Sequence, residues 1–296
     1  MSHKPTFPVI AGIITTILSV SLLSSVTSYF NLEHNGIVFS DKNSTDITRQ
    51  YNPIFNVSKA NTYLVNRYDT HYGLIKENEN IDKYWLWSDN MLAAQAIKEY
   101  NYSLYANITN TIRNYTQHYH IDFHSAWRAL IDPTSIDQPP SFRSPINKNV
   151  TDKIWYSDYN GSVELQCGDY ADIAFLKSIY FYEINKIEQS KACYNAGTNM
   201  FDGIGFKDKS FISDGSRYST YKVALWKIAT NITGFIESKE AMQVQDMIIG
   251  KAQDKITGGE YTYYSATLIP GNETNTETTS LAIIAGKPIA LPRQAG

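Results

Sequence analysis

Three segments of the chain combine aromatic side chains with acidic or amide side chains just before a stretch of helical character. They are residues 84–90 (YWLWSDN), residues 155–170 (from WYSD to GDY) and residues 259–277 (from GEYTYY to NTE). Flat aromatic faces beside carboxylates and amides suit sugar rings, which need an apolar stacking surface together with hydrogen-bonding groups. In an antiparallel array of helical hairpins, alternate helices start on the same side, so we expect the three segments to meet at one rim.

Cleavage of a glycosidic bond needs two carboxyl groups that flank the bond, one protonated and one ionised. We expect Asp89 and Asp169 to form this pair, with Glu260 and Glu277 as further candidates. The aromatic and amide residues of the same segments are the expected substrate-binding residues: Trp85, Trp87, Asn90, Trp155, Tyr156, Tyr261 and Tyr263.

Each acid also has a simpler explanation. Asp89 and Asp169 stand where a helix N-cap is expected, and Glu277 lies in a first turn, where the helix dipole favours negative charge. The tryptophans of the first two segments equally suit a buried core. From the sequence alone, helix capping by the acids and core packing by the tryptophans remain alternatives to a functional site.

A separate cluster, His118, His120 and His124 with Asp122, has the side-chain types that zinc accepts. On a helix His120 and His124 share a face and His118 does not. An exposed helix end with cationic imidazoles explains the same residues, so we predict no metal and no cofactor. P-loop, nucleophile-elbow and dinucleotide motifs are absent from the sequence, and a net charge of −3 offers no basic surface for nucleic acid.

Helical periodicity recurs from Ser58 onward and positions these residues. The predicted helices are 58–69, 90–100, 102–119, 170–184, 187–201, 217–230, 237–251 and 276–285, with short hairpins expected near 159–162 and 258–265. Hairpins of about 40–45 residues are typical of helical arrays. We therefore predict an all-α domain over residues 58–296, either an open helical-hairpin array or a closed (α/α) toroid, with short β-hairpins in its loops.

The segments WLWSDNMLAAQAI, GDYADIAFLKSIYFYE, GGEYTYYSA and NTETTSLAII resemble parts of six-hairpin (α/α) toroid proteins. Many of these are glycosidases, and some relatives are lyases or epimerases. The resemblance covers residues 58–285 as a pattern and implies a carbohydrate-active toroid. With about 260 residues after the N-terminal segment, it also implies a missing or shortened hairpin.

Residues 1–32 carry an uncharged apolar stretch of about the length that spans a hydrocarbon core. We predict a signal-anchor, or alternatively a cleaved signal peptide, followed by a polar stalk over 33–57. Lys4 before the stretch and Glu33 after it favour an extracytoplasmic position for the bulk of the chain. Nine sequons agree with this location: Asn43, Asn56, Asn101, Asn107, Asn114, Asn149, Asn160, Asn231 and Asn272.

The two cysteines, Cys167 and Cys193, suit a disulfide in an oxidising compartment. In a simple helical hairpin they would lie roughly 15 Å apart along the axis, and bridged Cα atoms lie within about 7 Å. A bridge therefore requires residues 166–168 to fold back, and the sequence leaves the pairing open.

These observations predict a glycoprotein of the cell membrane, single-pass with its bulk extracytoplasmic, or secreted if the N-terminal segment is cleaved. The expected partner is a glycan, and the expected activity is that of a glycoside hydrolase. The alternative is a non-catalytic surface protein that binds glycan or has a structural role in the cell envelope.

Overall fold

The computed structural model describes residues 30–33, 36–39, 54–135, 137–235 and 238–287. The chain divides into two units, residues 1–42 and 43–296. In the first unit β1 (Phe30–Glu33) pairs antiparallel with β2 (Gly36–Phe39). Most of the predicted signal-anchor and of the stalk lies outside the described residues. Within the described part, no helix combines the length and apolar character that crossing a bilayer requires.

The second unit contains a helix in each region where periodicity predicts one, so those helix predictions are confirmed. The bounds are α2 (Val57–Asn66), α3 (Leu92–Ile97), α4 (Tyr102–His118), α5 (Arg128–Ile131), α6 (Ala171–Glu183), α7 (Ile187–Thr198), α8 (Thr220–Thr233), α9 (Lys239–Ala252) and α10 (Thr276–Gly286). A single π-helical stretch, η1 (Leu86–Met91), leads into α3. On α4, Leu104, Ile108 and Ile112 are buried while Asn107 and Asn114 are exposed, as the two sequence patterns require.

Polar side chains fix where several helices begin. Asn56 starts α2 by accepting a hydrogen bond from the backbone N–H of Lys59, and Asn275 starts α10 by accepting one from Thr278. The start of α6 is capped from outside the helix, because the carboxylate of Asp208 accepts the N–H of Ala171 at 2.9 Å. Helix starts in this protein are therefore set partly by tertiary contacts.

The prediction of an all-α fold is wrong. The structure is 46% helical and 13% strand, and the strands of the second unit form four small sheets. These are β3 (Tyr68–Asp69) with β4 (Leu74–Ile75), β5 (Tyr84–Trp85) with β7 (Ile154–Asp158) and β6 (Ile146–Asn149), β8 (Tyr218–Ser219) with β10 (Tyr263–Tyr264), and β9 (Glu260–Tyr261) with β11 (Thr274–Asn275). Two of these pairings, β5 with β7 and β8 with β10, join segments far apart in the chain, whereas the others join segments that are close in the sequence.

The hairpin predicted around residues 159–162 also lies elsewhere. β7 turns back at residues 150–153 to pair antiparallel with β6, and its other edge pairs in parallel with β5. A parallel pair between residues 84–85 and 154–155 cannot come from a local turn. Periodicity within either segment does not reveal it.

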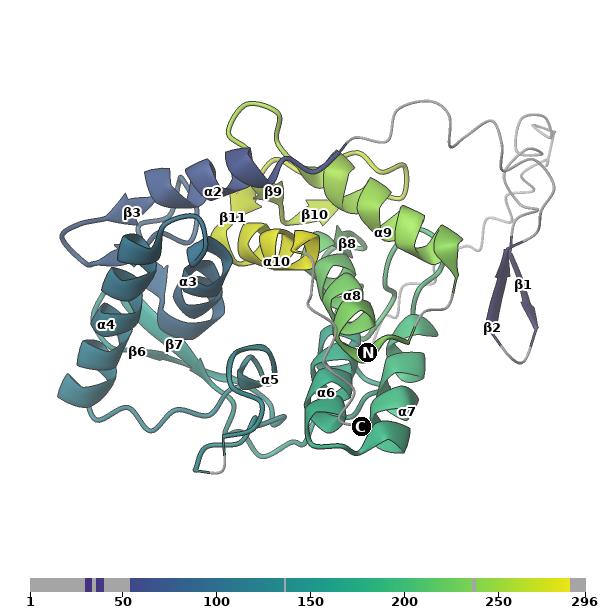
Figure 1. Cartoon of the computed structure of the whole chain (residues 1–296), viewed down its shortest axis with the longest axis horizontal. Coiled ribbons are helices and arrows are strands. Elements are labelled where there is room, and N and C mark those ends of the chain that lie inside the picture. The colour runs from purple at the N-terminus through teal and green to yellow at the C-terminus, as the bar shows by residue number, and fades with distance from the viewer. Residues whose placement is uncertain (1–29, 34–35, 40–53, 136, 236–237, 288–296) are drawn as a thin grey trace, which may run out of the picture. The chain divides into compact units, whose positions relative to one another are not determined.

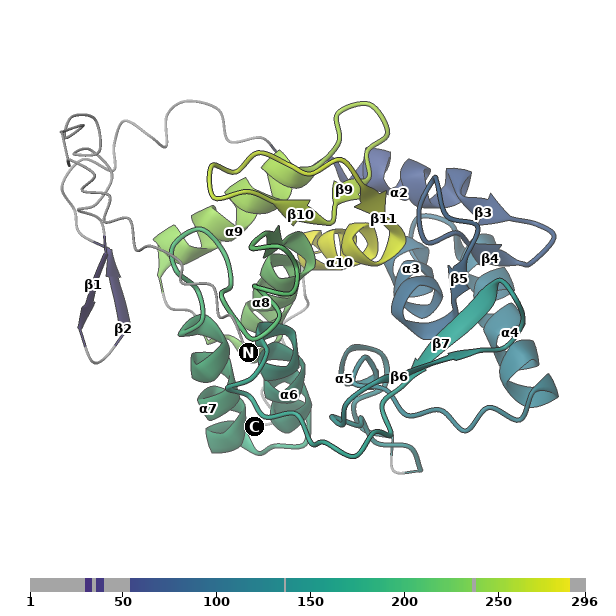
Figure 2. The same cartoon turned by 180° about the vertical axis from the view of Figure 1, so that it is seen from behind.

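Four helices form a row in which neighbours pack together, in the order α3, α10, α8 and α6 (Figures 1 and 2). α2 and α4 pack beside the α3 end of the row, and α7 and α9 pack beside the α6 and α8 end. In the core of the latter group, Trp226 of α8 contacts Phe201 and Phe206 and donates its indole N–H to the hydroxyl of Tyr194. The row places the N-termini of distant helices next to one another.

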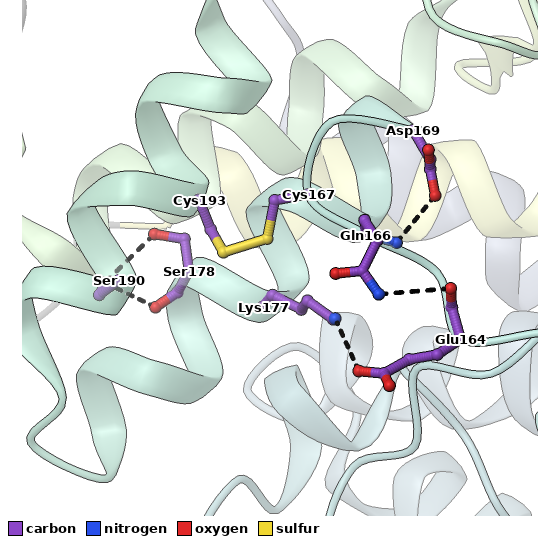
Figure 3. The surroundings of a disulfide bond; sticks show 8 residues. All are labelled: Glu164, Gln166, Cys167, Asp169, Lys177, Ser178, Ser190 and Cys193. Atoms are coloured by element: carbon purple, nitrogen blue, oxygen red, sulfur yellow. Dashed lines mark hydrogen bonds and ion pairs between the residues drawn. A yellow bond between two sulfur atoms is a disulfide. The ribbon is translucent and has the colours of Figure 1, made fainter.

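Cys167 and Cys193 form a disulfide with a Cα–Cα distance of 5.2 Å (Figure 3). The turn before α6 folds back toward α7, held by a hydrogen bond from the N–H of Gln166 to the carboxylate of Asp169. Two turns along the same helix pair, Ser178 and Ser190 bond to each other in the buried interface. The bridge thus closes the end of the α6–α7 pair that leads to the start of α6.

We expect replacement of both cysteines by serine to lower the free energy of unfolding. The bridge closes a loop with a sequence separation of 26, which corresponds to about 3.5 kcal/mol at 25 °C in the chain-entropy treatment. Urea denaturation followed by tryptophan fluorescence measures the loss. A reducing agent should destabilise the parent chain to the level of the variant and leave the variant unchanged; an equal effect on both chains would contradict a native bridge.

Candidate functional site

An open cavity of about 270 Å³ lies where four helical segments begin. Its wall contains the acids Glu77, Asp89, Asp172 and Glu277. The other lining residues are aromatic or neutral polar: Trp85, Ser88, Trp127, Asn147, Ser157, Tyr159, Tyr221 and Asn275. We call this space the acidic cavity.

Three of its side chains occupy the same position in their helices. Asp172 is the second residue of α6, Tyr221 is the second residue of α8, and Glu277 is the second residue of α10. The positive ends of the three helix dipoles are therefore near the cavity, where they favour negative charge. The opposite wall comes from the β6–β7 pair, where Ser157 donates its hydroxyl to the side chain of Asn147 at 2.8 Å.

Two of the acids keep their protons to unusually high pH. Loss of solvent, together with the negative charges of Asp172 and Glu77, raises the pKa of Glu277 to about 8. Asp89 is only 3% exposed, and burial with the charges of Glu277 and Glu77 raises its pKa well above the ordinary value. One carboxylate oxygen of Asp89 bonds to Ser88, while Oδ2 has no partner. Asp89 thus presents a buried, unpaired oxygen in the cavity wall.

The pKa of Asp172 is also raised, first by burial, but the ammonium group of Lys222 opposes this shift. The hydroxyl of Tyr221 donates to Asp172 Oδ2 at 3.2 Å, while Oδ1 has no hydrogen-bond partner. Lys222 itself forms a buried ion pair with Asp208 at 2.8 Å. The charge of Asp172 is one of the causes that raise the pKa of Glu277.

Trp85 connects Glu77 to the aromatic wall. Its indole N–H donates to Glu77 Oε2 at 3.0 Å, and its ring lies 6.1 Å from that of Trp155. The ammonium group of Lys83 lies 5.5 Å from the Trp85 ring and 4.8 Å from the Trp155 ring. This aromatic pair therefore already accommodates one cation.

The structure brings three of the expected site residues to the acidic cavity, namely Asp89, Glu277 and Trp85. Asp169 is not among them. Its carboxylate forms an ion pair with Lys209 at 2.6 Å and accepts the N–H of Gln166, beside the disulfide in Figure 3. Asp169 thus stabilises the turn before α6 and lies outside the cavity lining.

Of the third segment, residues 259–277, only part reaches the acidic cavity. Glu260 is fully buried, its carboxylate oxygens have no hydrogen-bond partner, and burial raises its pKa well above the ordinary value. Tyr263 packs under the guanidinium of Arg217 at 4.2 Å. Neither residue lines the acidic cavity, and Tyr261, which pairs with Thr274 in the β9–β11 ladder, does not either.

The other expected binding residues hold the structure around the cavity. Asn90 is buried and bonds to the backbone of Ile75 and Trp85. Trp87 stacks on Phe123 with 3.6 Å between ring centroids and lines a neighbouring pocket of about 470 Å³. Tyr156 lies beneath the ammonium group of Lys148.

The histidine cluster is not assembled. α4 ends at His118, so His120 and His124 do not share a helix face. His124 instead contacts the carboxylate of Asp158 at 3.2 Å. Among the described residues, no group of three or more His, Cys, Asp or Glu side chains is arranged to hold a metal ion.

Several cavity residues were not among the expected ones: Glu77, Ser88, Trp127, Asn147, Ser157, Asp172, Tyr159, Tyr221 and Asn275. A signal for Asp172 exists in the sequence, since it stands before an apolar run as Glu277 does. Glu77, Trp127 and Tyr159 are brought in by strand pairing and by the segments around α5, and no local pattern marks them.

Comparison with protein-family models, curated proteins and solved structures finds no match to this chain. What the acidic cavity does is therefore inferred from its own side chains.

We expect the Glu277→Gln variant to gain stability relative to the parent as the pH rises from 5 to 8. The pKa of Glu277 rises from 4.5 to about 8 on folding, so in this range the folded state binds more protons than the unfolded state. The unfolding free energy of the parent then falls with rising pH, and the glutamine variant lacks this pH dependence. Urea denaturation at pH 5, 6, 7 and 8 measures the difference.

Asp169→Asn is the matched control for this experiment. The pKa of Asp169 is lowered, first by its hydrogen bond to Lys209, so this carboxyl stays ionised between pH 5 and 8 in both states. The difference in unfolding free energy between Asp169→Asn and the parent should not change with pH over that range. A flat profile for Glu277→Gln as well would show that Glu277 does not hold its proton in the folded protein.

Proposed function

We propose that the protein is a glycan-processing enzyme of the glycoside hydrolase type, and that the acidic cavity is its active site. The observation that carries this proposal is the pairing of Glu277 with Asp172 beside Trp85 and Trp127 in one open cavity. Burial raises the pKa of both carboxyls, and the ammonium group of Lys222 opposes the shift at Asp172, so we assign the role of the acid to Glu277 and that of the ionised partner to Asp172. The tryptophans supply faces on which a sugar ring stacks.

In this mechanism Glu277 is the general acid and Asp172 is the ionised partner. Glu277 donates its proton to the glycosidic oxygen as the bond between that oxygen and the anomeric carbon breaks. Asp172 stabilises the positive charge that develops on the sugar, and water supplies the hydroxyl of the new reducing end while its proton restores the acid. With a pKa of about 8, Glu277 is protonated at neutral pH.

The cavity volume supports a site for one terminal or branch sugar unit. At about 270 Å³ it is close to the lower end of ligand pockets, which begin near ~300 Å³. A non-catalytic glycan-binding protein is the alternative, and in that case the same wall would bind a sugar without turnover.

We also propose an extracytoplasmic location, tethered by the N-terminal apolar segment. The disulfide between Cys167 and Cys193 suits an oxidising compartment. The sequon residues Asn56, Asn107, Asn114, Asn149, Asn160 and Asn272 are exposed in the structure, so a glycan is sterically acceptable at each of them.

We expect Glu277→Gln and Asp172→Asn each to lower kcat/KM by about 10²- to 10⁴-fold on a glycan that the parent cleaves. The glutamine cannot donate an acidic proton, and the asparagine cannot stabilise positive charge. A reducing-end assay on the full chain, run across a panel of oligosaccharides, measures the loss.

Asp169→Asn serves as the control, since Asp169 carries an exposed ion pair and lies outside the cavity lining. It should keep the parent kcat/KM. Binding by the parent without any turnover would support the non-catalytic alternative, and equal activity of all four proteins would remove the acidic cavity from the reaction.

We expect the exposed sequons to carry glycans and Asn231 to carry none. Asn231 is half-buried within α8, and its side-chain amide donates to the carbonyl of Ala285 at 3.4 Å. Glycopeptide mass spectrometry on the chain from its native cells gives the occupancy of each site. Unmodified asparagine at all the exposed sites would contradict the extracytoplasmic location.

A further inference from the structure

The lining of the acidic cavity has an unusual balance of charge. It contains four carboxyl groups, and none of its lining residues is a lysine, arginine or histidine. Lys222 is buried and already bonded to Asp208 and to the hydroxyl of Ser210. Lys83 lies over the Trp85–Trp155 pair and is not in the lining.

A sugar that bears a carboxylate, sulfate or phosphate would find no cationic side chain in this lining and would be repelled by those carboxyls that are ionised. The repulsion is strong in a partly desolvated site, where the effective dielectric is far below that of water. A neutral sugar would find hydrogen-bond acceptors but would leave the excess negative potential uncompensated. A positively charged group is the complement of this wall.

Aromatic side chains strengthen the preference for a cation. Trp85 and Trp127, with Tyr159 and Tyr221, form the apolar part of the wall. Ring faces beside carboxylates are the features that bind ammonium groups. The Lys83 ammonium group at 5.5 Å from Trp85 shows that this indole tolerates such a neighbour.

The side chain of Asp89 has an oxygen that can still accept a hydrogen bond. Asp89 is 3% exposed, and its Oδ2 has no partner. Asp89 and Glu77 both line the cavity, and the charge of Glu77 raises the pKa of Asp89. Glu77 in turn holds Trp85 by the indole N–H. An ammonium group, with its three N–H donors, can satisfy both acids while it lies against the Trp85 ring.

We propose that the acidic cavity binds an amino sugar with a free amine, and that Asp89, Glu77 and Trp85 recognise its ammonium group. This inference rests on the proposed function, since it names the sugar on which that site acts. Glu277 and Asp172 remain the reacting pair, and the ammonium-binding residues are positioned beside them. Hexosamine units without the N-acetyl group are the class of substrate that fits.

Binding of such a ligand should release protons. A cation beside Asp89 favours the ionised form of this carboxyl, whose pKa is raised by burial and by the charges of Glu277 and Glu77. Glu277, which also lines the cavity, keeps the proton that bond cleavage uses. The other titratable groups that face the ligand are Glu77, Asp172, Tyr159 and Tyr221. A neutral oligomer of the same length does not carry the charge that drives this release.

Isothermal titration of the full chain at pH 5.5, where the free amine of the sugar is protonated, with glucosamine oligomers, N-acetylglucosamine oligomers and uronic acid oligomers of equal length tests the proposal. We expect the amine-bearing oligomer to bind at least about tenfold more tightly than the N-acetylated one and the uronic acid oligomer to bind least. The enthalpy measured in two buffers with different ionisation enthalpies should show proton release for the amine-bearing oligomer alone.

Asp89→Asn and, as a second variant, Glu77→Gln should each remove the preference for the amine, while Asp169→Asn keeps it. Circular dichroism shows whether each variant is folded. Equal affinity for the amine-bearing and N-acetylated oligomers, or a preference that survives in both folded variants, overturns the inference.

A reducing-end assay on the same oligomers separates the two proposals. If the N-acetylated oligomer is cleaved and the amine gives no preference, the amine inference fails and the proposed hydrolase function stands. If the amine-bearing oligomer binds with proton release and is not cleaved, the ligand class stands and the hydrolase function fails. Absence of binding and cleavage for all three oligomers overturns both.

Discussion

The buried ion pair between Lys222 and Asp208 is the interaction on which the acidic cavity depends. Asp208 accepts the first N–H of α6 from Ala171 and binds the ammonium group that projects from the first turn of α8. It therefore holds the starts of two helices together, so that Asp172 and Tyr221 reach the same space. Removal of one partner of a buried pair costs about 3–5 kcal/mol, and removal of Asp208 would also leave the first turn of α6 without its cap. Lys222 opposes the upward pKa shift of Asp172, whereas the charge of Asp208 adds to that shift.

A different set of bonds positions the third helix start. The N–H of Thr276 donates to the carbonyl of Glu77 at 2.8 Å, and its hydroxyl donates to the carbonyl of Lys76 at 2.5 Å. The hydroxyl bond joins residues 200 positions apart, and the β9–β11 ladder leads directly into α10. The two-residue strands are thus part of the construction of the cavity, because they place Glu277 beside Glu77 and Asp89.

The sequence predicts much of the fold and only part of the site. Amphipathic periodicity and N-cap residues locate the helices to within a few positions, since both signals are local. Strands of two residues carry no periodicity, so their pairings, and with them the mixed α and β character, are not readable. The choice of Asp169 over Asp172 has a clear physical cause. Asp169 lies two residues before α6 and turns its carboxylate back to the loop toward Gln166, while Asp172, the second residue of α6, lines the cavity.

The electrostatics of the cavity follow from two opposing effects of unequal size. The three helix N-termini favour carboxylates by about 0.3–1 kcal/mol each. Desolvation and repulsion among the acids outweigh this contribution, because the pKa of Glu277 is raised to about 8. The resting cavity therefore keeps protons that a cation would displace. Positive charge that develops on a sugar during bond cleavage would relieve the same repulsion, so the arrangement favours the transition state over a neutral ground state. The excess of carboxyl groups over cations in the lining thus underlies both the proposed recognition of an ammonium group and the proposed chemistry.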